Sequence, residues 1–133
     1  MEGESLYVPP GLNLLVDIDS TPELNAVIVE GSIIFAPNLD PNHERFFDAN
    51  YIFVHGGLME VGTEEFPYSS KLTITLHGDV ADPYIPIYGN KVIGVRFGTL
   101  DMHGAVRNKV WTLLEYTVEP GSNVIQVQEA VDW

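Results

Sequence analysis

Apolar and polar residues alternate with a period of two over several stretches of this chain. The stretch 72–77 reads Leu-Thr-Ile-Thr-Leu-His, and a similar alternation returns over 110–114 and 124–128. A period of two places successive side chains on opposite faces of a β-strand, whereas no stretch keeps the 3.6-residue apolar period of a helix. One short helical turn is expected over 41–48. The pattern therefore predicts an all-β chain whose strands are separated by turns containing proline and glycine.

An internal repeat centred on glycine is the strongest feature of the sequence. When Gly31, Gly57 and Gly98 are placed in register, the matched positions on both sides of each glycine are apolar. These positions hold Ala26, Ile52 and Ile93, then Ile28, Val54 and Val95, then Ile33, Met59 and Leu100, and finally Phe35, Val61 and Met102. The repeat indicates three copies of one strand–glycine–strand unit.

The apolar alternation changes phase at each of these glycines. A continuous strand would turn half of its apolar side chains into water, so we expect a bend or bulge at the glycine, which permits unusual backbone angles. Stacked copies of such a unit predict a β-solenoid, similar to a β-helix, built from glycine-cornered strands with inserted loops. The alternative is a β-sandwich whose strand ends carry glycines. Either architecture fits a single domain over residues 1–133.

Several segments of the chain, taken in order, resemble the G8 domain family. They are residues 56–64 (GGLMEVGTE), 72–78 (LTITLHG), 86–91 (PIYGNK), 98–104 (GTLDMHG), 110–113 (VWTL) and 127–133 (VQEAVDW). The last segment is most similar to the fibrocystin-like branch. The family occurs in fibrocystin-like receptors and in hyaluronan-degrading cell-surface proteins. The resemblance implies an extracellular or cell-surface module, excised from a larger protein in which β-helix domains follow it.

Charge narrows the choice of partner. Nineteen Asp and Glu residues against six Lys and Arg give a formal net charge of −13. Such a surface repels phosphate backbones, which excludes nucleic acid, and it disfavours polyanionic glycans and anionic lipids. Neutral glycans, cations and basic proteins remain compatible partners. No apolar run approaches the roughly 18 residues that span a bilayer, so no direct membrane insertion is expected. The lack of cysteine excludes disulfides and thiolate metal sites.

Two kinds of cation site are candidates. His77, Asp101 and His103 lie at the ends of alternating strands, and stacking of those strands would give a two-histidine, one-carboxylate metal site. The alternative is that these histidines face solvent or cap turns. The carboxylate pairs Asp17/Asp19 and Asp79/Asp82 are candidates for calcium, which prefers oxygen ligands. The alternative for both pairs is a solvated acidic loop.

A set of aromatic and polar residues near the second and third repeats is the candidate ligand-binding site. It comprises Tyr68, Tyr84, Tyr88, Asn90, Lys91, Arg96 and Trp111. Aromatic rings stack on the apolar faces of sugars while amides and charges bind the hydroxyls, so this set predicts glycan binding. The alternative is that the large aromatics close the ends of the core.

The sequence favours a non-catalytic extracellular module for ligand binding or adhesion, because it contains no nucleophile elbow, cysteine nucleophile or metalloprotease motif. Part of a hyaluronan-depolymerising β-helix enzyme is the first alternative. Convergence of the four basic residues Lys71, Lys91, Arg96 and Arg107 on one face would favour it. The second alternative is a structural cap for a following β-solenoid, which a flat apolar C-terminal end would favour.

Overall fold

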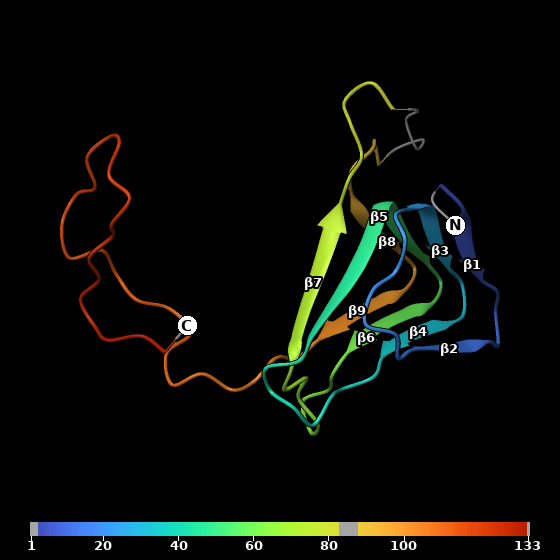
Figure 1. The fold of residues 1–133 in the computed structure, drawn as a ribbon, viewed down its shortest axis with the longest axis horizontal. Coiled ribbons are helices and arrows are strands. Elements are labelled where there is room, and N and C mark those ends of the chain that lie inside the picture. Colours follow the sequence, from blue (N-terminus) through green and yellow to red (C-terminus); the bar gives the residue numbers. More distant parts are fainter. Residues whose placement is uncertain (1–2, 83–87, 133) are drawn as a thin grey trace.

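The computed structural model describes residues 3–82 and 88–132, and in these residues it contains strands and no helix. The strands are β1 (Ser5–Val8), β2 (Asn13–Val16), β3 (Leu24–Val29), β4 (Ser32–Phe35), β5 (Glu44–His55), β6 (Leu58–Val61), β7 (Lys71–Leu76), β8 (Ile93–Arg96) and β9 (Thr99–Met102) (Figure 1). The all-β class is confirmed. The helical turn expected over 41–48 is wrong, because β5 begins at Glu44. Tyr84 lies outside the described residues.

The strands form two sheets in which every pair of named strands is parallel. The first sheet has the order β1-β3-β5-β7, with β8 also beside β5, and the second has the order β2-β4-β6-β9. Each copy of the repeat crosses a corner from the first sheet into the second, as β3 does into β4 and β5 into β6 (Figure 1). Successive copies therefore lie side by side as rungs.

The twelve-residue strand β5 has two neighbours on the same side. Its first half pairs with β7, from Glu44 opposite Lys71 to Ala49 opposite Leu76, and its second half pairs with β8. After β6 the chain returns to the first sheet as β7, beside the first half of β5. It then returns a second time as β8, beside the second half of β5. This detour explains the longer interval between the second and third glycines, and it places the start of β7 close to the end of β9.

The core lies between the two sheets and consists of side chains that alternate with exposed or half-buried ones along the strands. Its fully buried members are Val8, Val27, Val29, Ile33, Phe35, Phe47, Ile52, Val54 and Met59. The rings of Phe35 and Phe47 meet edge to face with their centroids 5.1 Å apart, a favoured geometry for buried aromatics. Five of them, Ile33, Phe35, Ile52, Val54 and Met59, are apolar positions of the repeat, so the repeat encodes part of the core.

The corner glycines are required by backbone contact between rungs. None of Gly31, Gly57 and Gly98 has a positive φ. A Cβ on Gly98 would lie 2.7 Å from the Gly57 carbonyl oxygen, and one on Gly57 would clash in the same way with Gly31. The left-handed backbone belongs to the preceding residue instead, with φ of 74° at Gly56 and 53° at Phe97. The expectation that these three glycines supply the special backbone angles is therefore wrong.

The first corner is one residue shorter than the others, which changes the register before the glycine. Val29 pairs with Val54, and Val27 pairs with Ile52. The sequence alignment of Ala26 with Ile52 is therefore one residue out of register. After the glycine the predicted alignment is correct, since Ile33 pairs with Met59 and Met59 with Leu100.

Residues 105–132, called here the C-terminal segment, form no named strand in the described part of the chain. The strands predicted over 110–114 and 124–128 are wrong, and the segment contains one isolated antiparallel bridge, between Leu114 and Val127. Figure 1 shows it projecting away from the two sheets, and Trp111 on it is 68% exposed. Alternation alone does not make a strand, because a strand also needs a neighbouring edge to pair with. No helix in the described residues is long and apolar enough to cross a membrane.

Substitution of Gly57 by alanine tests the role of backbone contact at the corners. The added methyl group meets the carbonyl oxygens of Gly31 and Val29, so we expect the free energy of unfolding to fall by about 3 kcal/mol or more. Gly104→Ala is the matched control, because nothing lies within 4 Å of its added Cβ, and its effect should stay within about 0.5 kcal/mol. Urea denaturation measures both. Equal losses in the two variants would contradict this explanation.

Candidate functional site

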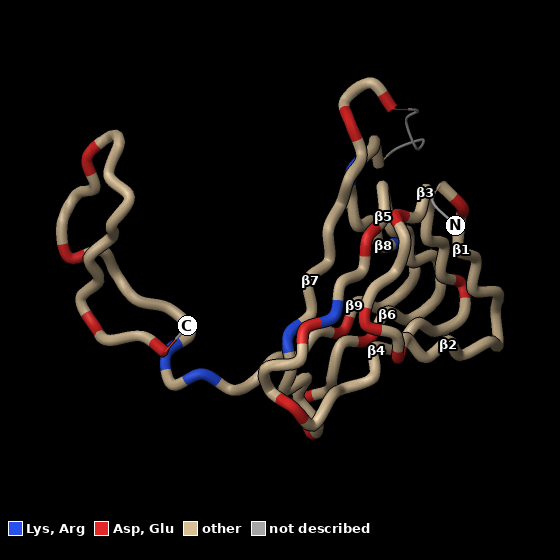
Figure 2. Tube along the Cα trace, in the orientation of Figure 1, with Lys and Arg blue, Asp and Glu red and all other residues tan. Residues whose placement is uncertain are grey.

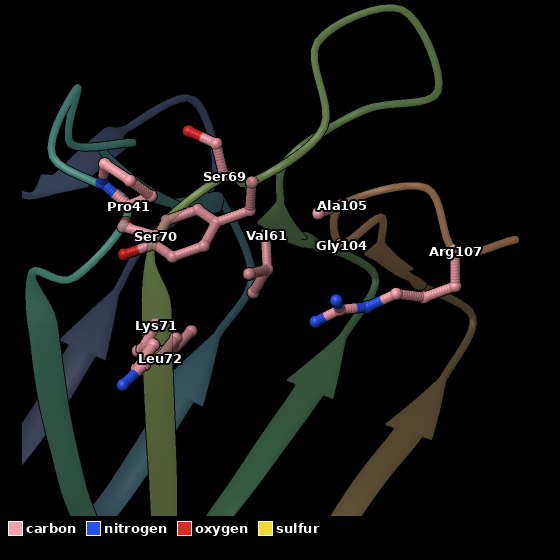
Figure 3. Close-up of a pocket in the computed structure, with 10 residues that line it drawn as sticks. Pro41, Val61, Ser69, Ser70, Lys71, Leu72, Gly104, Ala105 and Arg107 are labelled. Carbon is pink, nitrogen blue, oxygen red and sulfur yellow. The ribbon is translucent and has the colours of Figure 1, made fainter. Parts of the chain in front are cut away.

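A pocket of about 530 Å³ opens where the chain enters β7 and leaves β9 (Figure 3). We call it the Lys71–Arg107 pocket. Its wall consists of Pro41, Val61, Tyr68, Ser69, Ser70, Lys71, Leu72, Gly104, Ala105 and Arg107. Residues from three separate parts of the sequence therefore meet here, and the size suits one or two sugar rings or a compound of similar size.

A tight turn after β6 brings the chain back to this pocket. Gly62 has a φ of 70°, and the backbone N–H of Phe66 donates to Thr63 Oγ1 over 3.0 Å. The chain then pairs with the end of β9, because the Tyr68 N–H donates to the His103 carbonyl oxygen over 2.7 Å. The glycine is needed at this turn, since a side chain would combine a strained φ with a clash against Tyr68.

The pocket is locally cationic on an acidic protein. Its ten lining residues include Lys71 and Arg107 but no Asp, Glu or His. Figure 2 shows basic residues at the start of β7 and on the C-terminal segment, with acidic residues beside them in both places and over the rest of the described chain. Glu44 lies opposite Lys71 in the pairing of β5 with β7, but it is not among the lining residues. An anionic group would find its charge complement here.

Arg107 extends from the C-terminal segment towards the strands (Figure 3), and part of its hydrogen-bonding capacity is already used. Its Nη1 donates to the backbone oxygen of Asp132 over 2.9 Å. The N–H of Asn108 donates to the Asp132 carboxylate, and this hydrogen bond holds the pKa of Asp132 below its usual value, with a smaller contribution from the Arg107 charge. The guanidinium has five donors, so others remain for a ligand.

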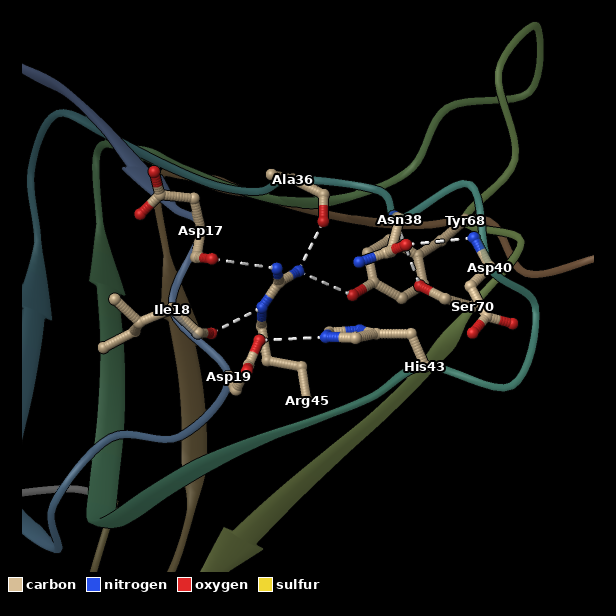
Figure 4. A network of polar contacts seen from close by, with 10 residues as sticks. All are labelled: Asp17, Ile18, Asp19, Ala36, Asn38, Asp40, His43, Arg45, Tyr68 and Ser70. Carbon is tan, nitrogen blue, oxygen red and sulfur yellow. Dashed lines mark hydrogen bonds and ion pairs between the residues drawn. The ribbon is translucent and has the colours of Figure 1, made fainter.

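A buried arginine, Arg45, contacts the pocket wall through Tyr68 (Figure 4). Arg45 is 3% exposed, and its guanidinium donates to the carbonyl oxygens of Ile18 at 2.6 Å, Asp17 at 3.2 Å and Ala36. It also donates to the Tyr68 hydroxyl at 2.9 Å. These acceptors satisfy a buried charge that would otherwise be costly. Arg45 thereby fixes Tyr68, which forms one wall of the pocket.

Comparison with known proteins gives the family of the chain. The family model described as G8 domain matches residues 1–115. The chain belongs to the G8 domain family. It is 37% identical over 132 residues to Fibrocystin-L and 35% identical over 134 residues to Fibrocystin, both from Mus musculus, which covers 99% of this chain and 3% of each relative. Cell surface hyaluronidase CEMIP2 from Homo sapiens is 48% identical over 59 residues, 43% of this chain and 4% of that protein.

The resemblance to the G8 family and its fibrocystin-like branch is confirmed by these matches. The G8 domain described here spans about 3% of the length of the fibrocystin relatives. The match therefore does not assign the activities and partners of those long proteins to this domain.

The G8 domain does not bring the three predicted metal ligands together. Asp101 and His103 are neighbours on one strand end, with an Oδ1–Nε2 distance of 2.7 Å. His77 belongs to the other sheet, where it lies 2.6 Å from Asp48 and 3.8 Å from Glu23. Across residues 3–82 and 88–132, no group of three His, Asp or Glu side chains is placed to hold a metal ion.

The aspartates of the two pairs predicted to bind calcium, Asp17/Asp19 and Asp79/Asp82, make contacts within the protein. Asp19 lies 2.9 Å from His43, while Asp17 contributes a backbone oxygen to Arg45 (Figure 4). Asp82 accepts from the Asp79 N–H at 2.5 Å, and Asp79 accepts from the Ala81 N–H at 3.0 Å. Calcium at either pair stays a prediction.

The predicted ligand-binding residues fall in separate places. Tyr68 lines the pocket, Tyr88 lies against Phe53, and Arg96 lies over Phe97. The side-chain amide of Asn90 donates to the backbone carbonyl oxygens of Asp79 and Asp82. Lys91 lies in a turn with φ of 52°, and Trp111 is on the C-terminal segment. Of the four basic residues considered together, Lys71 and Arg107 line one pocket. No pattern in the sequence pointed to the two serines. None pointed to Arg45 either, because its partners are mostly backbone carbonyls.

Replacement of Arg45 by leucine tests its supporting role. The change leaves several buried acceptors without a donor, so we expect the free energy of unfolding to fall by about 3 kcal/mol or more. Tyr68→Phe removes a single hydrogen bond and should cost about 1 kcal/mol. Chemical denaturation of the two variants gives the comparison. If Arg45→Leu costs no more than Tyr68→Phe, the network does not hold this part of the fold.

Proposed function

We propose that this G8 domain is a non-catalytic extracellular binding module of a larger cell-surface protein, and that its Lys71–Arg107 pocket receives an acidic group of a glycan. Two findings support the setting. The relatives contain the matched region as a small part of a long chain, and the name of one of them specifies a cell-surface protein that acts on hyaluronan. The pocket supports the choice of ligand.

The observation that carries the proposal is the charge of the pocket wall. Two cations face a pocket without any acidic lining residue, on a chain with a net charge of −13. An acidic surface elsewhere on the described chain disfavours an anionic ligand, whereas these two cations attract one. Arginine binds a carboxylate through paired hydrogen bonds, and lysine adds a point charge. The hydroxyls of Ser69 and Ser70 are suited to the neutral oxygens of a sugar.

The same wall argues for binding without cleavage. Glycoside hydrolysis ordinarily uses two carboxyl groups, one as an acid and one as a base or nucleophile, and the lining residues contain neither Asp nor Glu. The hyaluronan-depolymerising alternative also expected four basic residues on one face. Lys91 and Arg96 do not line the pocket. A carboxylated polymer would therefore be held at this site and not cut there.

A structural cap is the second candidate, and the last rung favours it. Val95, Leu100 and Met102 continue the core columns of the preceding rung, yet they are 38%, 39% and 44% exposed. A following rung of a parent β-helix would cover them. The pocket adjoins this rung only at the end of β9, where Gly104, Ala105 and Arg107 line it.

Charge reversal in the pocket tests the proposed function. We expect Lys71→Glu and Arg107→Glu each to weaken binding of a glucuronate-containing oligosaccharide at least about tenfold, because each change removes a charged hydrogen-bond donor and adds repulsion. Isothermal titration calorimetry at low and high salt measures the affinity, which should fall as salt rises.

Lys91→Glu is the matched control, since it makes the same change of charge at an exposed residue outside the pocket. Its effect should be less than about twofold. Equal losses in all three variants would show a general charge effect, and unchanged binding in the pocket variants would exclude this site.

A further inference from the structure

The last rung of the stack has an open edge. β8 pairs with β5 and β9 pairs with β6, and among residues 3–82 and 88–132 no strand pairs with their other edges. Val95 and Leu100 on this rung continue core columns of the preceding rung, yet both are more than one third exposed. Unpaired backbone beside open apolar columns is suited to one more strand–corner–strand unit.

The C-terminal segment repeats the sequence that forms the corner of the first rung. Residues 8–15 read VPPGLNLL and connect β1 to β2, and residues 118–125 read VEPGSNVI. The matched residues are Val8 and Val118, Pro10 and Pro120, Gly11 and Gly121, Asn13 and Asn123, Leu14 and Val124, and Leu15 and Ile125. This unit lies beyond residues 1–115, which the G8 family model matches, so the repeat continues past the family match.

The two corners also have the same turn. The N–H of Leu12 donates to the carbonyl oxygen three residues before it over 3.2 Å, and the N–H of Ser122 does so over 3.1 Å. Gly11 and Gly121 have φ of 79° and 89°. Proline followed by a glycine of positive φ is typical of a type II turn. The C-terminal unit therefore keeps its corner, although its two arms form no named strand.

The arms of this unit match the columns that the last rung leaves open. One core column holds Val8, Val29, Val54 and Val95, and another holds Leu14, Ile33, Met59 and Leu100. Alignment with the first rung places Val118 next in the first column and Val124 next in the second. Gln126 is the exception, because it would follow Met102.

We infer that residues 115–126, called here the fifth rung unit, dock on the open edge with 115–118 beside β8 and 123–126 beside β9. Figure 1 shows the undocked arrangement, in which the C-terminal segment projects away from the sheets. The connection over 103–114 reaches roughly 40 Å when extended, so the covalent link permits docking. It also favours this unit over a second molecule, since a tethered segment has an effective concentration in the millimolar range.

Docking would cover Val95 and Leu100 and give backbone partners to β8 and β9. The inference rests on the open rung of the structural-cap candidate and names what covers it. It does not depend on glycan binding at the Lys71–Arg107 pocket. An undocked unit would leave the open rung to a following rung of the parent chain, so the cap would survive the failure of this inference.

Asparagine substitutions at two neighbouring residues of the intact chain test the inference. Val124 and Ile125 are 67% and 62% exposed when undocked, so that arrangement predicts similar, small effects for Val124→Asn and Ile125→Asn. In the docked unit Val124 faces the core, whereas Ile125 follows Asp101 on the outer face. We expect Val124→Asn to lower Tm by at least about 5 °C and Ile125→Asn by about 2 °C or less, measured by scanning calorimetry.

An engineered disulfide gives a second readout. The chain has no cysteine, and the register of the first four rungs places Asn123 opposite Thr99 in the docked unit. Neighbouring strands are about 4.8 Å apart, so Thr99→Cys/Asn123→Cys should cross-link within one chain under mild oxidation. Thr99→Cys/Glu119→Cys is the control, because Glu119 lies before the corner, and it should not cross-link.

Mass spectrometry of digested monomer identifies the cross-link. The inference is overturned if Val124→Asn and Ile125→Asn lower Tm equally, or if the two cysteine pairs cross-link at the same rate. Cross-links that form only between two chains would overturn it as well.

Discussion

Close contact between the backbones of neighbouring rungs is the constraint on which the rest of this G8 domain depends. The chain turns from one sheet into the other at Gly31, Gly57 and Gly98, and at each turn a carbonyl oxygen of the previous rung fills the space of a side chain. Only a residue without Cβ permits that approach. The N–H groups that follow, at Leu58 and Thr99, donate to the Gly31 and Gly57 oxygens over 2.9 Å. Each corner is therefore in close backbone contact with the previous rung and hydrogen-bonded to it.

This stacking also creates the surfaces to which we assign function. Parallel rungs align equivalent positions, which places the core on one face of the first sheet and the register partners Tyr7, Ile28 and Phe53 on the other. The detour of the chain through β7 produces the pocket, since it returns the backbone to the end of β9 at Tyr68. Arg45 holds that return in place from inside the fold. The same rule that orders the core thus leaves a pocket lined by Lys71 and Arg107 at its margin.

The repeat predicted the strands β3 to β6, β8 and β9 and part of the core, because burial of alternate residues is a local pattern that sequence displays directly. The register before the corner could not be predicted, since the alignment on glycine hides the residue that the first corner lacks. The strand predicted around Val110 and Trp111 was wrong for a different reason. The stretch alternates, but in the described residues no strand lies beside it to pair with. Membership of the G8 family could be predicted because several short motifs occur in the same order as in the family.

The candidate site was harder to predict than the fold. Its charge comes from Lys71 and Arg107, which are 36 positions apart and meet through the detour between rungs. Net charge pointed away from acidic ligands because it averages over the whole surface, whereas binding depends on the local field. Tyr68 was proposed for its ring, but its hydroxyl is held by Arg45 and its place is the pocket wall. Spacing in the sequence does not carry this information.

The most direct test of the central claim is to map the contact surface by NMR while a glucuronate-containing oligosaccharide is added to the intact chain. Our account predicts that the largest changes in amide chemical shift, all saturating with one dissociation constant, occur at Ser69, Ser70, Lys71, Gly104 and Arg107. Changes of similar size spread over the acidic surface, or confined to strands away from the pocket, would contradict it.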